Sequence, residues 1–163
     1  MLSLFQSTTS RQTNLALTIL RIVTGVIFIA HGAQKLFVFG LDGVAGGFAQ
    51  MGVPMASIMG TFIGFLEFFG GIALVLGLLT RLVSLGLAFN MLGAIAFVHA
   101  KAGFFMPNGS EFVLILLGAT TALTIAGAGA VSLDALISRR DESVDVLPGD
   151  ATVAAPATAR RAA

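Results

Sequence analysis

Long apolar stretches separated by short polar or glycine-rich segments dominate the chain. Four of them reach about 20 residues, the length that a helix needs to cross the hydrocarbon core of a bilayer. They run from near Asn14 to near Phe39, from near Ala56 to Leu79, from Leu82 to about Val98 and from Phe112 to Leu133. Period-two alternation is missing, so membrane helices are favoured over barrel strands. We therefore predict an all-α, transmembrane four-helix bundle with a membrane domain at residues 14–138.

The connecting segments differ in length and composition. A tight turn at residues 79–82 predicts an antiparallel hairpin of the second and third helices. Residues 40–55 contain four glycines after Gly40 and leave room for a short interfacial helix or a re-entrant segment outside the membrane. Residues 99–110 are predicted to form an outer loop. The last segment, residues 139–163, is rich in Ala, Thr, Pro and Val and is predicted to be a disordered tail.

The positive charges of the short loops indicate the orientation. Cytoplasmic loops carry an excess of Lys and Arg. One side of the predicted bundle carries the larger group, Arg11, Arg81, Arg139 and Arg140, and the other carries Lys35 and Lys101. Both ends of the chain, residues 1–13 and 139–163, are therefore predicted to be cytoplasmic, with the protein in the cell membrane.

Composition narrows the possible partners and chemistry. The chain of 163 residues is 56% hydrophobic and 10% charged, whereas a soluble domain carries about 25% charged residues. Membrane lipids are thus expected neighbours. A net charge of +1 argues against a nucleic-acid partner. The absence of cysteine excludes disulfides, thiol redox chemistry and cysteine-held iron–sulfur clusters. The first apolar stretch is too long for a signal peptide and contains Arg21.

Small residues recur on one face of each predicted helix at spacings of three and four. Such stripes allow close helix contact in lipid, where burial from water does not drive association. The four stripes are Arg21, Gly25, Phe28, Gly32 and Lys35; Gly60, Gly64, Glu67 and Gly71; Gly86, Asn90, Gly93 and Phe97; and Gly118, Ala122, Ile125 and Gly129. Three of them also carry polar residues, so we predict a bundle with its polar groups inside.

The ionisable residues within the spans form the candidate site. A charge near mid-membrane costs about 3 kcal/mol on insertion scales, so Glu67 needs a partner or a proton. Counting about 1.5 Å per residue places Glu67 nearer in depth to His31 than to Arg21. His31 is thus the favoured partner, Arg21 the alternative, and Lys35 could pair with Glu111 at the outer edge. The candidate catalytic residues are Glu67 and His31, and the candidate ligand-binding residues are Arg21, Lys35, Asn90 and His99.

Simpler roles stand beside these. Arg21 can extend to the cytoplasmic interface as a topology signal, and Lys35 can anchor the outer interface. Asn90 can form an interhelical hydrogen bond, and His99 can merely end a helix.

These residues also resemble a known family. His31-Gly32 followed by Lys35-Leu36, with Arg21 upstream, resembles the first helix of the DoxX family. Glu67 and the sequence over residues 70–81 resemble its second helix and turn. The resemblance covers residues 15–136 and implies a four-helix protein of the bacterial or archaeal cytoplasmic membrane. Family members include a small subunit of an archaeal thiosulfate:quinone oxidoreductase. The positions that the family pattern marks are Arg21, His31, Lys35, Glu67 and Arg81.

Several functions are compatible with these features. The leading hypothesis is a quinone-linked oxidoreductase, or the membrane subunit of one, with a membrane quinone as its cofactor and a redox partner subunit. A non-enzymatic scaffold for a redox or detoxification partner is an alternative. A small permease would need a homo-oligomer, because four helices leave little room for alternating access. A b-type haem between His31 and His99 is a further alternative.

Overall fold

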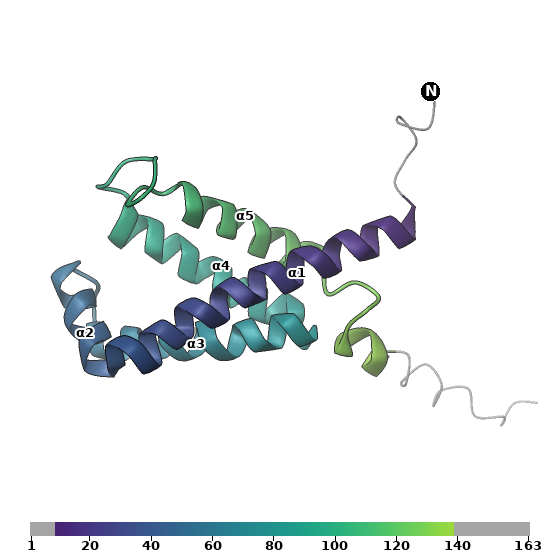
Figure 1. Cartoon of the computed structure of the whole chain (residues 1–163), viewed down its shortest axis with the longest axis horizontal. Coiled ribbons are helices and arrows are strands. Elements are labelled where there is room, and N and C mark those ends of the chain that lie inside the picture. Colours follow the sequence, from purple (N-terminus) through teal and green to yellow (C-terminus); the bar gives the residue numbers. More distant parts are fainter. Residues whose placement is uncertain (1–8, 139–163) are drawn as a thin grey trace, which may run out of the picture.

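The fold is described by a computed structural model for residues 9–138, and this part of the chain is helical. Its elements are α1 (Ser10–Ala33), the π-helix η2 (Gln34–Phe39), α2 (Gly40–Gln50), α3 (Ala56–Leu76), α4 (Thr80–Ala94), the π-helix η3 (Ile95–His99) and α5 (Glu111–Ala126). The two ends of the described chain lie at the same end of the molecule, opposite α2 (Figure 1). The predicted disordered tail at residues 139–163 lies outside the described residues.

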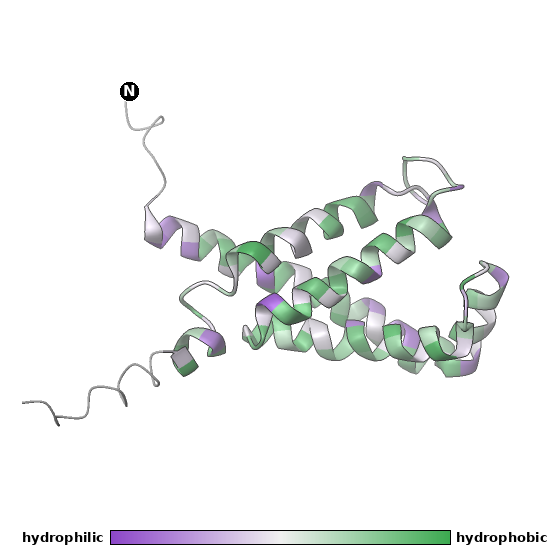
Figure 2. Ribbon diagram, turned by 180° about the vertical axis from the view of Figure 1, so that it is seen from behind, coloured by the Kyte–Doolittle hydropathy of each residue, from purple (hydrophilic) through white to green (hydrophobic). Residues whose placement is uncertain are grey.

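The helices confirm a membrane protein and correct one predicted span. Three helical stretches, Ser10–Gln50, Ala56–Leu76 and Thr80–His99, are long and apolar enough to cross a membrane. Hydrophobic residues run along most of their length (Figure 2). The fourth, α5, is shorter and ends at Ala126 instead of the predicted Leu133. The reason is backbone geometry: Gly127 and Gly129 adopt φ values of 86° and 76°, which a helix cannot contain.

The predicted segment after the first span is indeed helical. Gly40, with φ 69° and ψ 164°, interrupts the run between η2 and α2 and turns the chain. The short helix α2 then packs against α3. Its buried residue Val44 faces Gly60 of α3, where an added Cβ would be 3.0 Å from the valine Cγ1.

The glycine stripes of the first two spans bring α1 and α3 into backbone contact. An added Cβ on Gly32 would be 2.3 Å from the amide nitrogen of Phe68, and one on Gly71 would be 2.7 Å from the carbonyl oxygen of Gly25. The contact between α1 and α3 is the most extensive in the fold. The prediction of close packing through small residues is confirmed for this helix pair.

The stripes of the other two spans have the predicted role only in part. Gly86 and Gly129 do pack against other helices, near Leu66 and Asn14, but Gly93 and Gly118 do not have the predicted role. Gly118 is exposed, and neither it nor Gly93 would bring an added Cβ within 4 Å of another group. Instead, α4 and α5 pack through larger side chains, among them Leu87, Met91 and Leu116. Large apolar side chains fill the wider space between these helices, so small residues are not needed there.

A polar network joins the helix ends opposite α2. Arg21 is only 2% exposed, and its guanidinium donates hydrogen bonds to the carbonyl oxygens of Leu74 (2.9 Å), Val75 (3.3 Å) and Val131 (2.7 Å). The first two carbonyls belong to the last turn of α3, which carries the negative end of the helix dipole; the Leu74 carbonyl also accepts from the N–H of Gly77. Arg21 therefore ties α1, α3 and the segment after α5 together.

Asp134 completes this network from the end of the described chain. Its two carboxylate oxygens accept hydrogen bonds from the backbone N–H groups of Leu79 (2.7 Å) and Thr80 (2.9 Å). Leu79 has a left-handed backbone and no capping side chain of its own. A carboxylate distant in sequence thus provides the N-terminal cap of α4.

We expect Asp134→Ala to lower the free energy of unfolding by about 1 kcal/mol, the usual cost of a lost N-cap. Denaturant titration of the purified protein in detergent micelles measures this change. Asp42→Ala, at an exposed position in the first turn of α2, is the control and should change stability by less than about 0.5 kcal/mol. Equal effects of the two substitutions would contradict the capping role.

Candidate functional site

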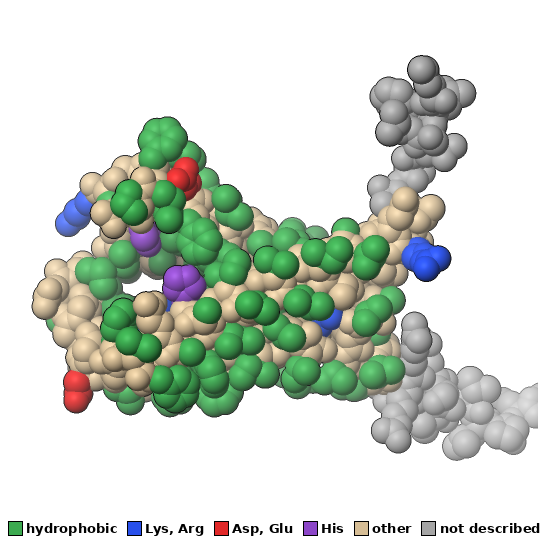
Figure 3. All heavy atoms as spheres, in the orientation of Figure 1, with side chains coloured by type: hydrophobic (Ala, Val, Ile, Leu, Met, Phe, Trp, Pro, Cys, Tyr) green, Lys and Arg blue, Asp and Glu red, His purple; other side chains and the backbone are tan. Residues whose placement is uncertain are grey.

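A cavity of about 700 Å³ lies between α2, α3 and α4. The molecule is hollowed at the end that carries α2, between α2 and the loop joining α4 to α5 (Figure 3). Most of the lining is apolar. The polar and charged side chains among the lining residues are Gln34, Lys35, Glu67, Asn90 and His99. This size and composition are typical of a small-molecule site, in which few polar groups orient a mostly apolar ligand.

Three side chains from three helical elements meet in the cavity wall. The Lys35 ammonium of η2 forms an ion pair with Glu67 Oε2 of α3. Asn90 Nδ2 of α4 donates a hydrogen bond of 2.8 Å to Glu67 Oε1. The side chain of Glu67 is 6% exposed and that of Lys35 is 20% exposed. The carboxylate thus has a partner for each oxygen, which offsets the cost of burying its charge.

This arrangement leaves free groups on Lys35 and Asn90. The ammonium has three N–H groups, and one is used by Glu67; the amide retains one N–H and its oxygen. Glu67 therefore orients two donors, and the groups left for a ligand are mainly donors. Such a wall suits a ligand whose polar part accepts hydrogen bonds, such as a carbonyl oxygen.

Both π-helical stretches of residues 9–138 contribute to this cavity. From η2 come Gln34, Lys35 and Phe39, and from η3 come Phe97, Val98 and His99. π-Helical geometry is rare, and when it interrupts an α-helix it is frequently found at functional sites because it redirects side chains. Lys35, near the start of η2, lies on the same face as Gly32, toward α3 and Glu67.

Glycines keep the cavity open. Gly43 and Gly47 of α2 and Gly93 of α4 line it. At Gly47 and Gly93 an added Cβ would meet nothing within 4 Å, and at Gly43 only its own helix neighbour Phe39. Gly93, which the sequence assigned to helix packing, thus provides space for the cavity instead.

Phe62 and Phe89 mark where the cavity reaches the apolar surface. These rings line it from α3 and α4, yet are 57% and 65% exposed. The contact between α3 and α4 is much less extensive than that between α1 and α3, so these two helices leave a wedge between them. A ligand dissolved in the lipid would meet this side of the cavity.

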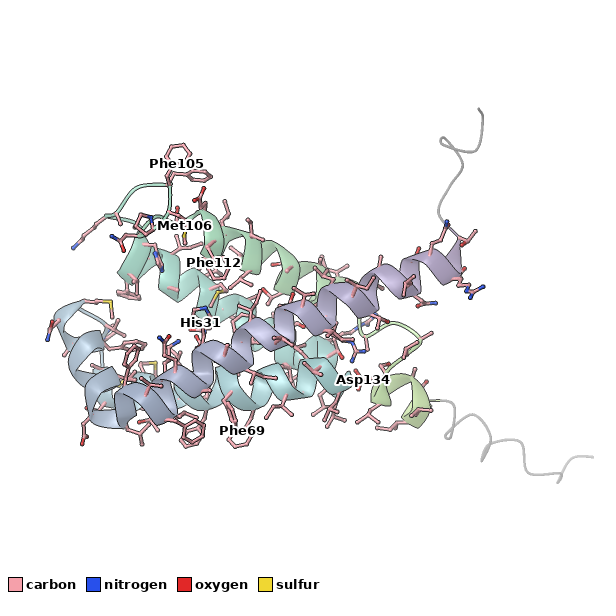
Figure 4. All side chains as sticks on the ribbon, viewed as in Figure 1. His31, Phe69, Phe105, Met106, Phe112 and Asp134 are labelled. Atoms are coloured by element: carbon pink, nitrogen blue, oxygen red, sulfur yellow. The ribbon has the colours of Figure 1, made fainter. Side chains whose placement is uncertain are left out.

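The predicted partner of Glu67 is wrong. His31 is exposed outside the cavity, and its ring lies 6.0 Å from that of Phe112 (Figure 4). The alternative partner, Arg21, binds the helix ends described above. Lys35 does not pair with Glu111 either, because it binds Glu67, and Glu111 Oε1 accepts from the amide of Met106. Depth alone fails because it ignores the helix face: Lys35, unlike His31, lies on the stripe of α1 that packs against α3.

Of the six predicted site residues, four line the cavity: Glu67, Lys35, Asn90 and His99. His99 Nδ1 is 2.8 Å from the carbonyl oxygen of Asn108 in the loop after η3. His31, the other predicted haem ligand, is not among the residues that line this cavity. Within residues 9–138, no group of three or more His, Asp or Glu side chains is placed to hold a metal ion.

The sequence prediction missed two residues with a structural part in the cavity or its surroundings, Gln34 and Asp134. Gln34 precedes Lys35 and lines the same cavity, and a polar residue next to an intramembrane lysine was the available signal. Asp134 does not touch the cavity but caps α4. The sequence indicated Asp134 only indirectly. The helix after Leu79 has no capping side chain of its own, so its first backbone N–H groups need a hydrogen-bond acceptor from another part of the chain.

Comparison with known proteins assigns the class. The family model named DoxX matches residues 16–100, which include Lys35, Glu67, Asn90 and His99. This chain belongs to the DoxX family of membrane proteins.

Among its relatives is the Bacillus subtilis protein named "Putative oxidoreductase CatD". It is 34% identical over 128 residues, which cover 78% of this chain and 91% of that protein. The Escherichia coli "Inner membrane protein YphA" is 32% identical over 124 residues, 72% of this chain and 87% of that protein. The Mycobacterium tuberculosis "Uncharacterized membrane protein Rv3486" is 30% identical over 132 residues, 74% of this chain and 80% of that protein. No solved structure matches the chain.

Proposed function

We propose that this protein is a quinone-binding component of the cytoplasmic membrane, acting as a quinone-linked oxidoreductase or as the membrane subunit of one. The observation that carries this proposal is the ion pair and amide of Lys35, Glu67 and Asn90 in the wall of an otherwise apolar cavity. Two relatives support the proposal by name: "Putative oxidoreductase CatD" supports redox chemistry, and "Inner membrane protein YphA" supports a place in the cytoplasmic membrane.

A quinone matches what the cavity offers. Its ring and isoprenoid tail are apolar, and its two carbonyl oxygens accept hydrogen bonds. Lys35 and Asn90 have N–H groups free to donate to one carbonyl, while Glu67 holds both donors in place. The exposed rings of Phe62 and Phe89 give a lipid-dissolved molecule a route to the cavity.

The proposed reaction needs two electrons and two protons for each quinone reduced to quinol. The electrons come from a partner subunit that carries a redox centre. The Lys35 ammonium passes one proton to the carbonyl oxygen that it contacts and regains a proton from solvent, because the Glu67 carboxylate stabilises the ammonium. The second proton reaches the other carbonyl oxygen from solvent. Glu67 is thus primarily a positioning residue, and Lys35 is the group that would touch the quinone.

Quinone binding by the purified protein tests the proposal. We expect isoprenoid quinone to co-purify and a short-chain ubiquinone or menaquinone analogue to bind. Glu67→Gln should weaken binding about tenfold, equivalent to about 1.4 kcal/mol, since Lys35 loses its charged anchor. Gly93→Leu should have at least the same effect because its side chain fills the cavity.

Matched variants separate binding from general damage. Gly118→Leu makes the same change at an exposed helix position with equal space around it, and Glu111→Gln makes the same change in the first turn of α5. Both should bind quinone like the unaltered protein. The proposed site would be disproved if the protein binds no quinone, or if neither Glu67→Gln nor Gly93→Leu changes its affinity for quinone. Retention of a co-purifying partner by such a protein would favour the scaffold hypothesis.

A further inference from the structure

The cavity occupies only the half of the bundle toward α2. Its lining on α3 ends at Glu67 and includes no residue nearer the α3–α4 turn, and its lining on α4 begins at Gly86. The first and second spans run past this level to the opposite end, where Arg21 and Asp134 lie. The cavity therefore ends inside the bundle and does not reach the end opposite α2.

A closed apolar core lies at this inner end of the cavity. Phe28 of α1, Leu74 of α3 and Leu87 of α4 are at most 1% exposed, and Met91 and Leu116 pack in the same cluster. Along α4, the fully buried Leu87 lies between the polar side chains of Asn90 and Ser84. Packed hydrocarbon here gives a proton or a polar headgroup no hydrogen-bonding partner.

Beyond the core lies a second barrier made of polar groups. Thr80 and Ser84 are fully buried, and Arg21 is 2% exposed while bound to three carbonyl oxygens. Gly77 permits this packing, because an added Cβ there would be 1.9 Å from the Arg21 guanidinium. These bonds tie α1 and the end of α3 to the segment after α5. A second cavity of about 500 Å³ at this end, lined among others by Thr80 and Asp134, shares no lining residue with the first.

We propose that the cavity exchanges protons and polar ligand groups with one side of the membrane only, the side on which α2 lies. His99, in the part of the lining nearest the outer loop, is a titratable group on that route. This proposal rests on the proposed function only for the identity of the ligand. If a quinone is reduced here, its protons are drawn from the α2 side, which the predicted topology makes the outer side.

The absence of cysteine from the chain makes a direct test possible. Single-cysteine variants are expressed in cells, and right-side-out and inverted vesicles are treated with a charged, membrane-impermeant methanethiosulfonate. Asp42→Cys in α2 and Arg11→Cys at the start of α1 are exposed and mark the two sides. Gly93→Cys reports on the cavity, and Ser84→Cys reports on the far side of the core.

We expect Gly93→Cys to be labelled in the same vesicles as Asp42→Cys and at least tenfold more slowly in those that label Arg11→Cys. Ser84→Cys should stay unlabelled in both and react after denaturation, which shows that the thiol is present. Labelling of Gly93→Cys from the Arg11 side or from neither side, or labelling of native Ser84→Cys, would overturn one-sided access. A short-chain quinone should slow labelling at Gly93→Cys. One-sided labelling without this protection would disprove quinone binding and leave the access proposal standing.

Discussion

Lys35→Met should lower the free energy of unfolding by about 3 kcal/mol, because it leaves the buried Glu67 carboxylate without its cation. Asn90 still donates one hydrogen bond, but the charge at 6% side-chain exposure then lacks compensation. Titration with a denaturing detergent in micelles measures the loss. Lys101→Met, in the exposed loop, is the matched control and should change stability by less than about 0.5 kcal/mol.

The double variant Lys35→Met with Glu67→Leu sharpens this test. Replacing both members of a buried ion pair by apolar residues is often neutral, so we expect most of the lost stability to return. A coupling energy near zero in this cycle would show that the pair contributes nothing to the fold. Quinone binding should be lost in the double variant even when stability is restored, since Lys35 is gone and Asn90 no longer has the Glu67 carboxylate that orients it.

Gly32→Ala should also destabilise the protein by about 3 kcal/mol, because the new methyl group would overlap backbone. The added Cβ would be 2.3 Å from the amide nitrogen and 2.7 Å from the Cα of Phe68. Backbone cannot rotate aside as a side chain can, so α1 and α3 must separate. That separation would also move Lys35, which follows in η2, away from Glu67.

Gly118→Ala is the control for this prediction. Its Cβ would meet nothing within 4 Å, so stability should stay the same or rise by up to about 1 kcal/mol from the better helix propensity. The same denaturation experiment compares the two variants. Similar stabilities for Gly32→Ala and Gly118→Ala would refute the close approach of α1 and α3.

The sequence predicted the helices better than their contacts. The three long spans, the helical segment after the first and the tight turn follow from runs of apolar residues and from glycine positions, which act locally. The last helix was predicted seven residues too long, because Ala and Gly at residues 126–130 are apolar enough to continue a span. Only the left-handed backbone at Gly127 and Gly129 ends it.

The sequence predicted the central residue of the candidate site but not its partner. An intramembrane carboxylate must have a partner, and this rule alone identified Glu67. Choosing that partner by depth favoured His31, whereas the structure brings Lys35 and Asn90 to Glu67. Depth takes no account of the helix face. Lys35 shares the stripe of Gly32, which packs against α3 beside Glu67, whereas His31 lies off that stripe.

By itself, the sequence determined that this is a helical membrane protein whose glycines and ionisable groups share helix faces, because lipid imposes those requirements on every residue it meets. Tertiary structure decided what each face does. The glycines of α1 and α3 join two backbones, while Gly93 of α4 leaves room for a cavity, although the sequence pattern is the same. The difference arises because a small residue allows close approach without enforcing it, and only the distance between helix axes determines whether the space is filled.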